Sequence, residues 1–476
     1  MFELAHTKPA SGTRTSAVEA RGGGGIVVAV LMLIAALGSA LAPGAPLTAQ
    51  PVQRAAGGST IDAESGSRLP LLARKDMRDE AAAQIYATLA GPGGEPPHGT
   101  TAIALYSPGT AAALGRIHAY LRTESALGPR QFELLGLITA REMNLAYEWA
   151  VHERAAAQAG LPTAVVEVVR RNAPVTGLAS LDALLIDFGR QLFRNRGVDS
   201  ATFAAVLQRL GRQQTFDVIM ALAYPAMAGI LQRAVDQRPP PGFDPAALPA
   251  VAGVGTPTGR PGEFVELGPR PPVAPDVHED SYYRLPLLRR EELDPRGREI
   301  FDRLVGSDRT TAPRGPVGMT LNSPQLADPV QQLNDLLRIR GALDRRLAEI
   351  VVATTGREMN SQYQWIVHGA AAAQAGAEQP VLEAIRVDAD LSGLAERDAV
   401  AIAFTRELFR EPAVRADTFA AALRLFGARG TVELAALAGD YLMMTTVYNA
   451  LGMRLRADQN PTLPHRAGAP VGAEWR

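Results

Sequence analysis

Residues 141–160, REMNLAYEWAVHERAAAQAG, recur as residues 357–376, REMNSQYQWIVHGAAAAQAG. Fourteen positions at the beginning, middle and end of the two stretches carry the same residue type, among them the opening REMN and the closing AAAQAG. Both stretches are rich in alanine and contain no proline, a composition that favours an α-helix. A stretch of this length that occurs twice in one chain predicts a repeated helical unit.

One constant offset, that between positions 141 and 357, relates matching segments along most of the chain. Chance does not place so many matches on one offset, so the sequence predicts a tandem duplication. Each copy is long enough to bury a core of its own, and we expect the two copies to pack as a pseudo-dimer. Further matches are RLPLL at 68–72 and 284–288, Ser-Pro at 107–108 and 323–324, Leu-Phe-Arg at 192–194 and 408–410, and Thr-Phe at 202–203 and 418–419.

The apolar residues inside each copy follow the period of a helix. In the first copy, Phe132, Leu135 and Ile138 fall on one helix face, and residues 347–354 repeat the pattern in the second copy. No segment shows a convincing alternation of apolar and polar residues, which would indicate a strand. We therefore predict an all-α fold, with two homologous helical domains in tandem.

The two copies are separated and flanked by segments rich in proline, glycine and small polar residues. Because these segments lack apolar periodicity, we expect a disordered leader, a linker and a tail around the two domains. The predicted boundaries are a signal peptide at 1–49, the leader at 50–66, the first domain at 67–236, the linker at 237–280, the second domain at 281–456 and the tail at 457–476.

The N-terminus has the pattern of a secretory signal peptide. Basic residues precede an apolar run at 26–37, and small residues follow it. The run is shorter than the roughly 20 residues that a membrane-spanning helix needs. We expect an exported protein, periplasmic or extracellular, cleaved after Ala42 or Ala49. An uncleaved N-terminal membrane anchor is the alternative.

Charge and cysteine content exclude several classes of protein. The formal net charge is −1, which argues against a nucleic-acid-binding protein, because such proteins carry an excess of basic residues to neutralise phosphates. The chain has no cysteine. Disulfides, thiolate nucleophiles and cysteine-ligated metals are therefore excluded.

The repeated helix carries the one pair of histidines at equivalent positions, His152 and His368. Glu133 lies nineteen residues before His152, and Glu349 lies nineteen before His368. Two antiparallel helices would bring each glutamate against its histidine. A carboxylate beside an imidazole raises the pKa of the ring, and such a pair can move protons near neutral pH.

A second carboxylate is available in the first copy only. Glu148 lies one helical turn before His152, whereas the second copy has Gln364 at this position. Either a carboxylate is not required at both sites or only one site is active, and we favour the copy with Glu148. A metal held by His152, Glu148 and Glu133 is a second hypothesis; the favoured one needs neither a metal nor a cofactor.

The pattern Arg-Glu-x-x-x-x-Tyr-Glu-Trp-x-x-His, followed by alanines and Ala-Gly, resembles the carboxymuconolactone decarboxylase family. The resemblance covers most of both halves, and its specific part is the repeated helix and the glutamate before it. This family belongs with the alkyl hydroperoxidase D-like fold. The resemblance thus implies an all-α bundle that forms trimers and hexamers, and we expect a homo-oligomer, a trimer of tandem chains.

The peroxidase branch of that superfamily has a Cys-x-x-Cys pair whose second cysteine lies four residues before the histidine. In this sequence these positions hold Leu145 and Glu148 in the first copy and Ser361 and Gln364 in the second. Thiol peroxidase chemistry is therefore excluded in both copies. The Glu–His pairs remain.

The decarboxylase branch implies a carboxy-lyase reaction on a small organic acid or lactone. Arg141 or Arg357 would then bind the substrate's carboxylate, because arginine forms charge-assisted hydrogen bonds with carboxylates. Tyr147 and Tyr363 are candidate contacts to the substrate, with packing in the core or an interface as the alternative.

Each of these assignments has a structural alternative. A histidine on a helix with apolar flanks is often a core residue, and Arg141 could form a salt bridge with Glu142 at the end of its helix. Both copies could also serve as a non-catalytic helical binding or assembly module. A pocket lined by Arg, Glu and His would favour an enzyme, and a filled core would favour the structural role.

Overall fold

The computed structural model describes residues 60–475, except 92, 245–247, 250, 252–257 and 271. The predicted signal peptide, its cleavage sites and most of the leader lie outside the described residues. The described part is all-α, as predicted. Its one small sheet pairs β1 (Phe264–Val265) with β2 (His465–Arg466) in antiparallel orientation.

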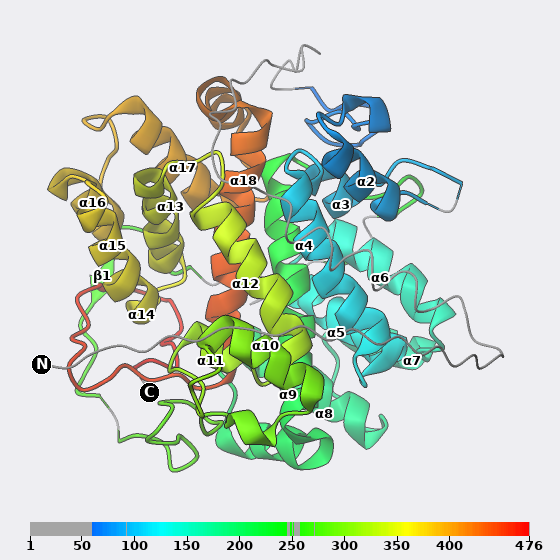
Figure 1. Cartoon of the computed structure of the whole chain (residues 1–476), viewed down its shortest axis with the longest axis vertical. Coiled ribbons are helices and arrows are strands. Elements are labelled where there is room, and N and C mark those ends of the chain that lie inside the picture. Colours follow the sequence, from blue (N-terminus) through cyan, green and yellow to red (C-terminus); the bar gives the residue numbers. More distant parts are fainter. Residues whose placement is uncertain are drawn as a thin grey trace, which may run out of the picture. The chain divides into compact units, whose positions relative to one another are not determined.

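Helices of the two copies follow one another in similar order along the chain (Figure 1). The segments η2 and η5 are π-helical turns, and η1 and η4 are short 3₁₀ turns. The first copy contains η1 (Arg74–Asp76), α2 (Glu80–Leu89), α3 (Gly99–Ala104), α4 (Pro108–Ala119), η2 (Tyr120–Glu124), α5 (Gly128–Glu142), α6 (Ala146–Gln158), α7 (Thr163–Arg170), α8 (Ser180–Asn195) and α9 (Ser200–Ala234). The second contains η4 (Arg290–Glu292), α10 (Pro295–Val305), α11 (Pro316–Thr320), α12 (Pro324–Arg338), α13 (Arg345–Glu358), α14 (Gln362–Gln364), η5 (Trp365–Gly369), α15 (Ala370–Gln374), α16 (Gln379–Arg386), α17 (Glu396–Arg410) and α18 (Ala416–Ala450).

The long helices α9 and α18 lie side by side between the other helices of the two copies (Figure 1). Both are kinked at a glycine with a positive φ, 76° at Gly211 and 68° at Gly427, a conformation that other residues rarely adopt. By length and composition alone, α9 is the one described helix that could cross a membrane, but 89% of its most apolar 18-residue window is buried inside the protein. A helix that is apolar and buried to this extent is typical of a protein core, so α9 is a core helix of this structure.

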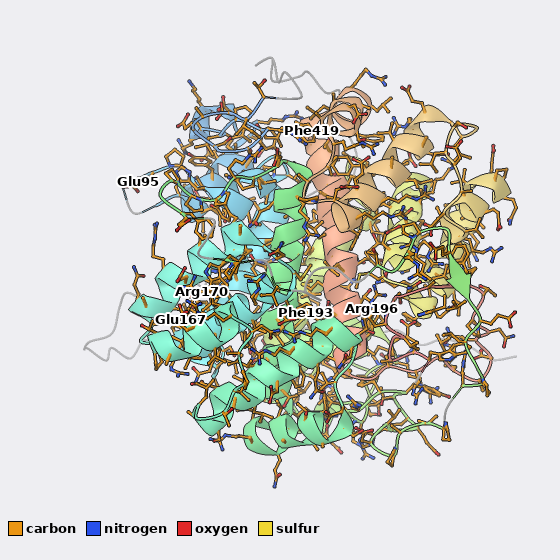
Figure 2. All side chains as sticks on the ribbon, turned by 180° about the vertical axis from the view of Figure 1, so that it is seen from behind. Glu95, Glu167, Arg170, Phe193, Arg196 and Phe419 are labelled. Atoms are coloured by element: carbon orange, nitrogen blue, oxygen red, sulfur yellow. The ribbon has the colours of Figure 1, made fainter. Side chains whose placement is uncertain are left out.

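Contacts between the two copies come in matching pairs. Nη1 of Arg68 donates to the carbonyl of Val414 at 2.5 Å, and Nη1 of Arg284 donates to the carbonyl of Val198 at 2.7 Å. The two arginines occupy equivalent positions in the two copies, and so do the two valines. Each guanidinium also lies over a phenylalanine ring of the other copy, Arg68 over Phe419 (labelled in Figure 2) and Arg284 over Phe203. Reciprocal contacts of this kind are those of a two-fold interface between like units.

The repeated Arg-Glu and Leu-Phe-Arg motifs meet in the structure. The carboxylate of Glu142 accepts two hydrogen bonds from Arg194, and the carboxylate of Glu358 accepts two from Arg410. These pairs join α5 to α8 and α13 to α17. The motif glutamate therefore pairs with an arginine of another helix and not with Arg141 beside it, contrary to the structural alternative considered from the sequence.

The tail packs against the second copy, whereas its composition predicts no packed structure. Arg466 is fully buried and forms ion pairs with Glu358 and Asp388. Further along, Oε1 of Glu474 accepts a hydrogen bond from the hydroxyl of Ser361 at 2.5 Å. Composition misses this docking because buried polar contacts hold the tail, and not an apolar face with a regular period.

Candidate active site

A tight turn folds the repeated helix back onto the helix before it. Asn144 ends α5 with φ of 56°, and Asn360 ends α13 with φ of 50°. Asparagine enters this left-handed region more readily than most other residues with a side chain. In each copy the amide after the asparagine donates to a carbonyl five residues earlier at 2.8 Å. The turn therefore places residues nineteen apart in the sequence side by side.

The first cluster consists of Arg122, Glu133 and His152. Oε2 of Glu133 lies 2.7 Å from Nδ1 of His152, and Oε1 of Glu133 accepts a hydrogen bond from Nε of Arg122 at 2.8 Å. Glu133 is 2% exposed and His152 is 5% exposed. The predicted contact between the glutamate and the imidazole is thus present in the structure.

Glu148 supplies a second carboxylate on the other side of the same ring. Its Oε2 lies 3.4 Å from Nε2 of His152. Its Oε1 accepts a hydrogen bond from the side-chain amide of Gln232, which also donates to the hydroxyl of Thr100 at 2.9 Å. Helix α9 therefore fixes the position of this carboxylate.

The surroundings of His152 favour its charged form. Burial alone would lower the pKa of the imidazole, but hydrogen bonds and charges from Glu133 and Glu148 outweigh it and raise the pKa to about 9. Burial likewise opposes ionisation of Glu133, and His152 and Arg122 together hold its pKa below the ordinary value. At neutral pH the first cluster thus holds an imidazolium beside the carboxylate of Glu133, and an imidazolium is a proton donor.

Gly136 makes room for the imidazole of His152. A Cβ at this position would lie 2.3 to 2.5 Å from three atoms of the ring, much closer than any normal contact. The second copy has Val352 at the equivalent place on α13. The ring of His152 therefore lies against the backbone of α5 in a way that depends on a glycine.

We expect Gly136→Ala to displace His152 and to lower its pKa from about 9, because the ring would lose its hydrogen bond to Glu133. Titration of the imidazole by NMR measures this shift. Gly369→Ala is the matched control: its Cβ would lie 3.6 Å from the ring of Trp365, an ordinary contact. A titration of His152 that is the same in Gly136→Ala and in the wild type would contradict the expectation.

The second cluster repeats the arrangement with Arg338, Glu349 and His368. Oε2 of Glu349 lies 2.7 Å from Nδ1 of His368, and its Oε1 accepts from Nε of Arg338 at 2.8 Å. Arg345 also lies 2.8 Å from the same oxygen. Gln364, at the position equivalent to Glu148, donates its amide to the backbone carbonyl of Tyr441 at 2.8 Å.

The surroundings of His368 favour its neutral form. Burial lowers the pKa of this imidazole below the ordinary value, and the charges of Arg338 and Arg345 lower it further against the effect of Glu349. The two clusters therefore share one geometry and differ in charge. At neutral pH the second imidazole is a proton acceptor, whereas the first is a proton donor.

The first cluster is poorly arranged for a metal ion. Glu133 and Glu148 approach opposite nitrogens of the His152 ring, so no single point lies within ligand distance of all three groups. In the part of the chain that the structure describes, no group of three or more His, Cys, Asp or Glu side chains is arranged to hold a metal ion. The metal hypothesis gains no support from this geometry.

Arg141 and Arg357 bind backbone carbonyls, not the imidazole clusters. Nη1 of Arg141 donates to the carbonyl of Pro249 at 2.7 Å, and Nη1 of Arg357 donates to the carbonyl of Pro464 at 2.7 Å. Each arginine also bonds the asparagine three residues later. They attach the linker and the tail to the two copies. A substrate-binding role of either arginine stays a prediction, and we leave both out of the proposed site.

Tyr147 and Tyr363 make packing contacts in the structure. A Cβ on Gly99 would overlap the phenol of Tyr147, so the ring lies directly on this glycine, and burial raises the pKa of the phenol to about 12. The ring of Tyr363 packs edge-on against Tyr448 with centroids 5.4 Å apart. A contact of either tyrosine with substrate stays a prediction.

Several residues of the clusters are not predicted from the sequence. Arg122 and Arg338 carry a usable signal, because they occupy equivalent positions in the two copies and lie eleven residues before their glutamates. Gly136 and Gln232 carry no such signal, since neither recurs in the second copy. Their roles emerge only from the packing of α5 and α9 against the ring and Glu148.

A scan of the chain against protein-family models finds no match, and a search among curated proteins finds none. The resemblance to carboxymuconolactone decarboxylases therefore depends on the residues of the repeated helix and the glutamate before it. Any assignment of function depends on the same residues and on their geometry.

Proposed function

We propose that this protein is an exported, carboxymuconolactone decarboxylase-like enzyme that transfers protons to or from a small organic acid or lactone without thiol chemistry. One observation carries the proposal. Each copy holds a buried histidine 2.7 Å from a glutamate of the neighbouring helix, and that glutamate is bound by an arginine. A cysteine-free relay of this kind has the components of general acid–base catalysis.

In the proposed decarboxylation, the bond between the substrate carbon and its carboxylate breaks and carbon dioxide leaves. The electron pair of that bond moves into the conjugated lactone, and the imidazolium of His152 gives a proton to the carbon that receives the pair. Glu133 keeps the ring oriented through Nδ1. Glu148, 3.4 Å from Nε2, is placed to pass a proton taken up from solvent to the ring after His152 has given its own to the substrate.

Export and assembly belong to the proposal as well. Export is supported by the basic residues and the apolar run at 26–37 of the sequence. A trimer of tandem chains is supported by the resemblance alone, which implies oligomers built from helical units. Sedimentation of the purified chain tests the trimer directly.

A non-catalytic binding or assembly module is the competing candidate. The observation in its favour is the near-complete burial of Glu133 and His152, whose polar atoms face Arg122, Glu148 and each other. Buried ionic networks of this kind also occur as structural elements. The two candidates differ in whether a small acid changes the state of the imidazole.

The experiment is an assay of carbon dioxide release by the purified full chain with small carboxylated lactones. We expect release, and we expect Glu133→Gln to reduce kcat by roughly a hundredfold, the lower range for loss of acid–base assistance. Glu153→Gln is the matched control, since Glu153 follows His152 on α6 but contacts Trp149 and Arg170 instead. Equal rates in the two variants, or no release from any such lactone, would defeat the proposal.

A further inference from the structure

The second cluster lies near a buried carboxyl group that the proposed reaction does not use. Asp440 lies on α18 and is fully buried. Its Oδ2 accepts a hydrogen bond from the side-chain amide of Asn334 at 2.8 Å. Among the residues that the structure describes, Oδ1 of Asp440 has no hydrogen-bond partner. A buried carboxyl with one free oxygen needs an explanation.

Contacts along α12 connect Asp440 to the Arg–Glu–His cluster. Asn334, which binds Asp440, lies one turn before Arg338 on the same face of this helix. Arg338 in turn binds Glu349, which binds His368. The charge of Arg338 acts on both Asp440 and His368.

A second connection runs through α18. Tyr441 follows Asp440 in the chain, and its ring packs edge-on against the imidazole of His368 with centroids 4.8 Å apart. The same phenol interacts with Asn334. Asp440 is thus connected to the cluster by two neighbouring helices.

The two copies differ in which helix carries an additional carboxyl group. The first copy has Glu148 on the repeated helix and Tyr224 on α9. At the equivalent positions the second copy has Gln364 and Asp440. Each copy therefore carries one carboxyl group in addition to its Glu–His pair, but the group comes from a different helix.

The additional carboxyl group is held in the same way in both copies. In the first, the amide of Gln232 donates to Oε1 of Glu148. In the second, the amide of Asn334 donates to Oδ2 of Asp440. In each case a neutral side-chain amide orients one carboxyl oxygen and leaves the other for a different partner. For Glu148 that partner is Nε2 of His152.

We propose that Asp440 is the second proton-exchanging carboxyl of the His368 cluster. It is connected to the imidazole through Asn334, Arg338 and Tyr441, whereas Glu148 faces the ring of His152 directly. The inference rests on the proposed function and extends it to the second copy, with the same class of ligand, a small organic acid or lactone. Its free Oδ1 is the atom that carries the exchangeable proton, because Oδ2 accepts the amide of Asn334.

The charges around Asp440 support this role. Burial raises the pKa of the carboxyl to about 7, against the effects of Asn334 and Arg338. The phenols of Tyr441 and Tyr448 also lie on α18, and Glu349 acts on Tyr441. Near neutral pH the second cluster thus combines a carboxyl that is about half protonated with a neutral imidazole, whereas the first combines an imidazolium with the carboxylate of Glu133.

The test is a titration of the full chain with ¹³C-labelled aspartate carboxyls, followed by NMR and assigned with Asp440→Asn. We expect one carboxyl signal, absent in this variant, to titrate near neutral pH. We also expect its midpoint to shift measurably in His368→Ala and to stay unchanged in His152→Ala. The inference is overturned if the Asp440 signal titrates in the ordinary acidic range, or if its midpoint is the same in His368→Ala as in the wild type.

Asp217→Asn is the matched control. Asp217 is also buried, lies on α9 and has a raised pKa because of burial, but it is bound by Ser125 and Tyr120 away from both imidazoles. Its replacement should leave the signal of Asp440 unchanged. The titration needs no substrate, so it separates the two proposals. If Asp440 responds to His368 but no lactone is turned over, only the proposed function fails.

Asp440 also predicts a dependence of stability on pH. Its pKa is about 7 in the folded protein and about 4 in the unfolded chain, so the folded state binds the proton more tightly between these values. Wild-type stability from this group is present at low pH and is lost as pH rises through about 7. We expect Asp440→Asn to have the Tm of wild type near pH 4 and a higher Tm at pH 8. If Asp440→Asn and the wild type have the same Tm at pH 8 as well as at pH 4, this expectation is contradicted.

Discussion

Replacing both His152 and His368 with alanine is expected to lower turnover of a carboxylated lactone by roughly a hundred- to ten-thousandfold. The reason is that each replacement removes the group that, in the proposed reaction, exchanges a proton with the substrate, and leaves the glutamate bound only by arginine. The helical circular dichroism should stay that of wild type, because apolar packing around α9 and α18 holds the helices together.

The single variants separate the two copies. His152→Ala alone should remove most of the turnover, since the first copy has the charged imidazole and Glu148. His278→Ala is a suitable control, because His278 lies in the linker and belongs to neither cluster. Turnover retained in the double variant would contradict the assignment of both histidines.

Arg466→Met is expected to lower the free energy of unfolding by about 3–5 kcal/mol, the range for breaking a buried ion pair. Arg466 is fully buried and binds Glu358 and Asp388, which are themselves buried. Without it, Arg410 is the remaining cation paired with both carboxylates. Urea unfolding followed by circular dichroism measures the change.

Arg456→Met, directly before the same tail, provides the comparison. Arg456 pairs with Asp458 on the surface, where ion pairs contribute little because water screens them. We expect its unfolding midpoint to equal that of wild type. If the two variants unfold at the same urea concentration, the ion pairs of Arg466 do not stabilise the second copy and the docking of the tail has another cause.

The fold and the centre of each cluster are predictable from the sequence for physical reasons. Helical periodicity is a local property, so it predicts α5 and α13 without knowledge of their partners. The spacing of nineteen residues between Glu133 and His152 is also local, because one turn at Asn144 closes it. Repetition at one offset then separates these residues from single histidines such as His118.

The remaining parts of the site depend on contacts that no local pattern contains. Asp440 meets Asn334 across 106 residues, and Gln232 meets Glu148 across 84. The contacts of Arg141 could not be predicted for a similar reason. A buried guanidinium next to the repeated motif can bind a substrate or a backbone carbonyl, and its contact with Pro249 depends on a segment more than a hundred residues away.

The pairing of α9 with α18 has a consequence for how the two sites can differ. In a homodimer one gene encodes both halves, so a mutation that alters one site alters the other equally. Here the two copies are encoded by separate parts of one gene, although Arg68 and Arg284 each contact the other copy in the same way. Each side can therefore acquire its own acid without changing its neighbour, and the exchange of Glu148 and Tyr224 for Gln364 and Asp440 is such a divergence.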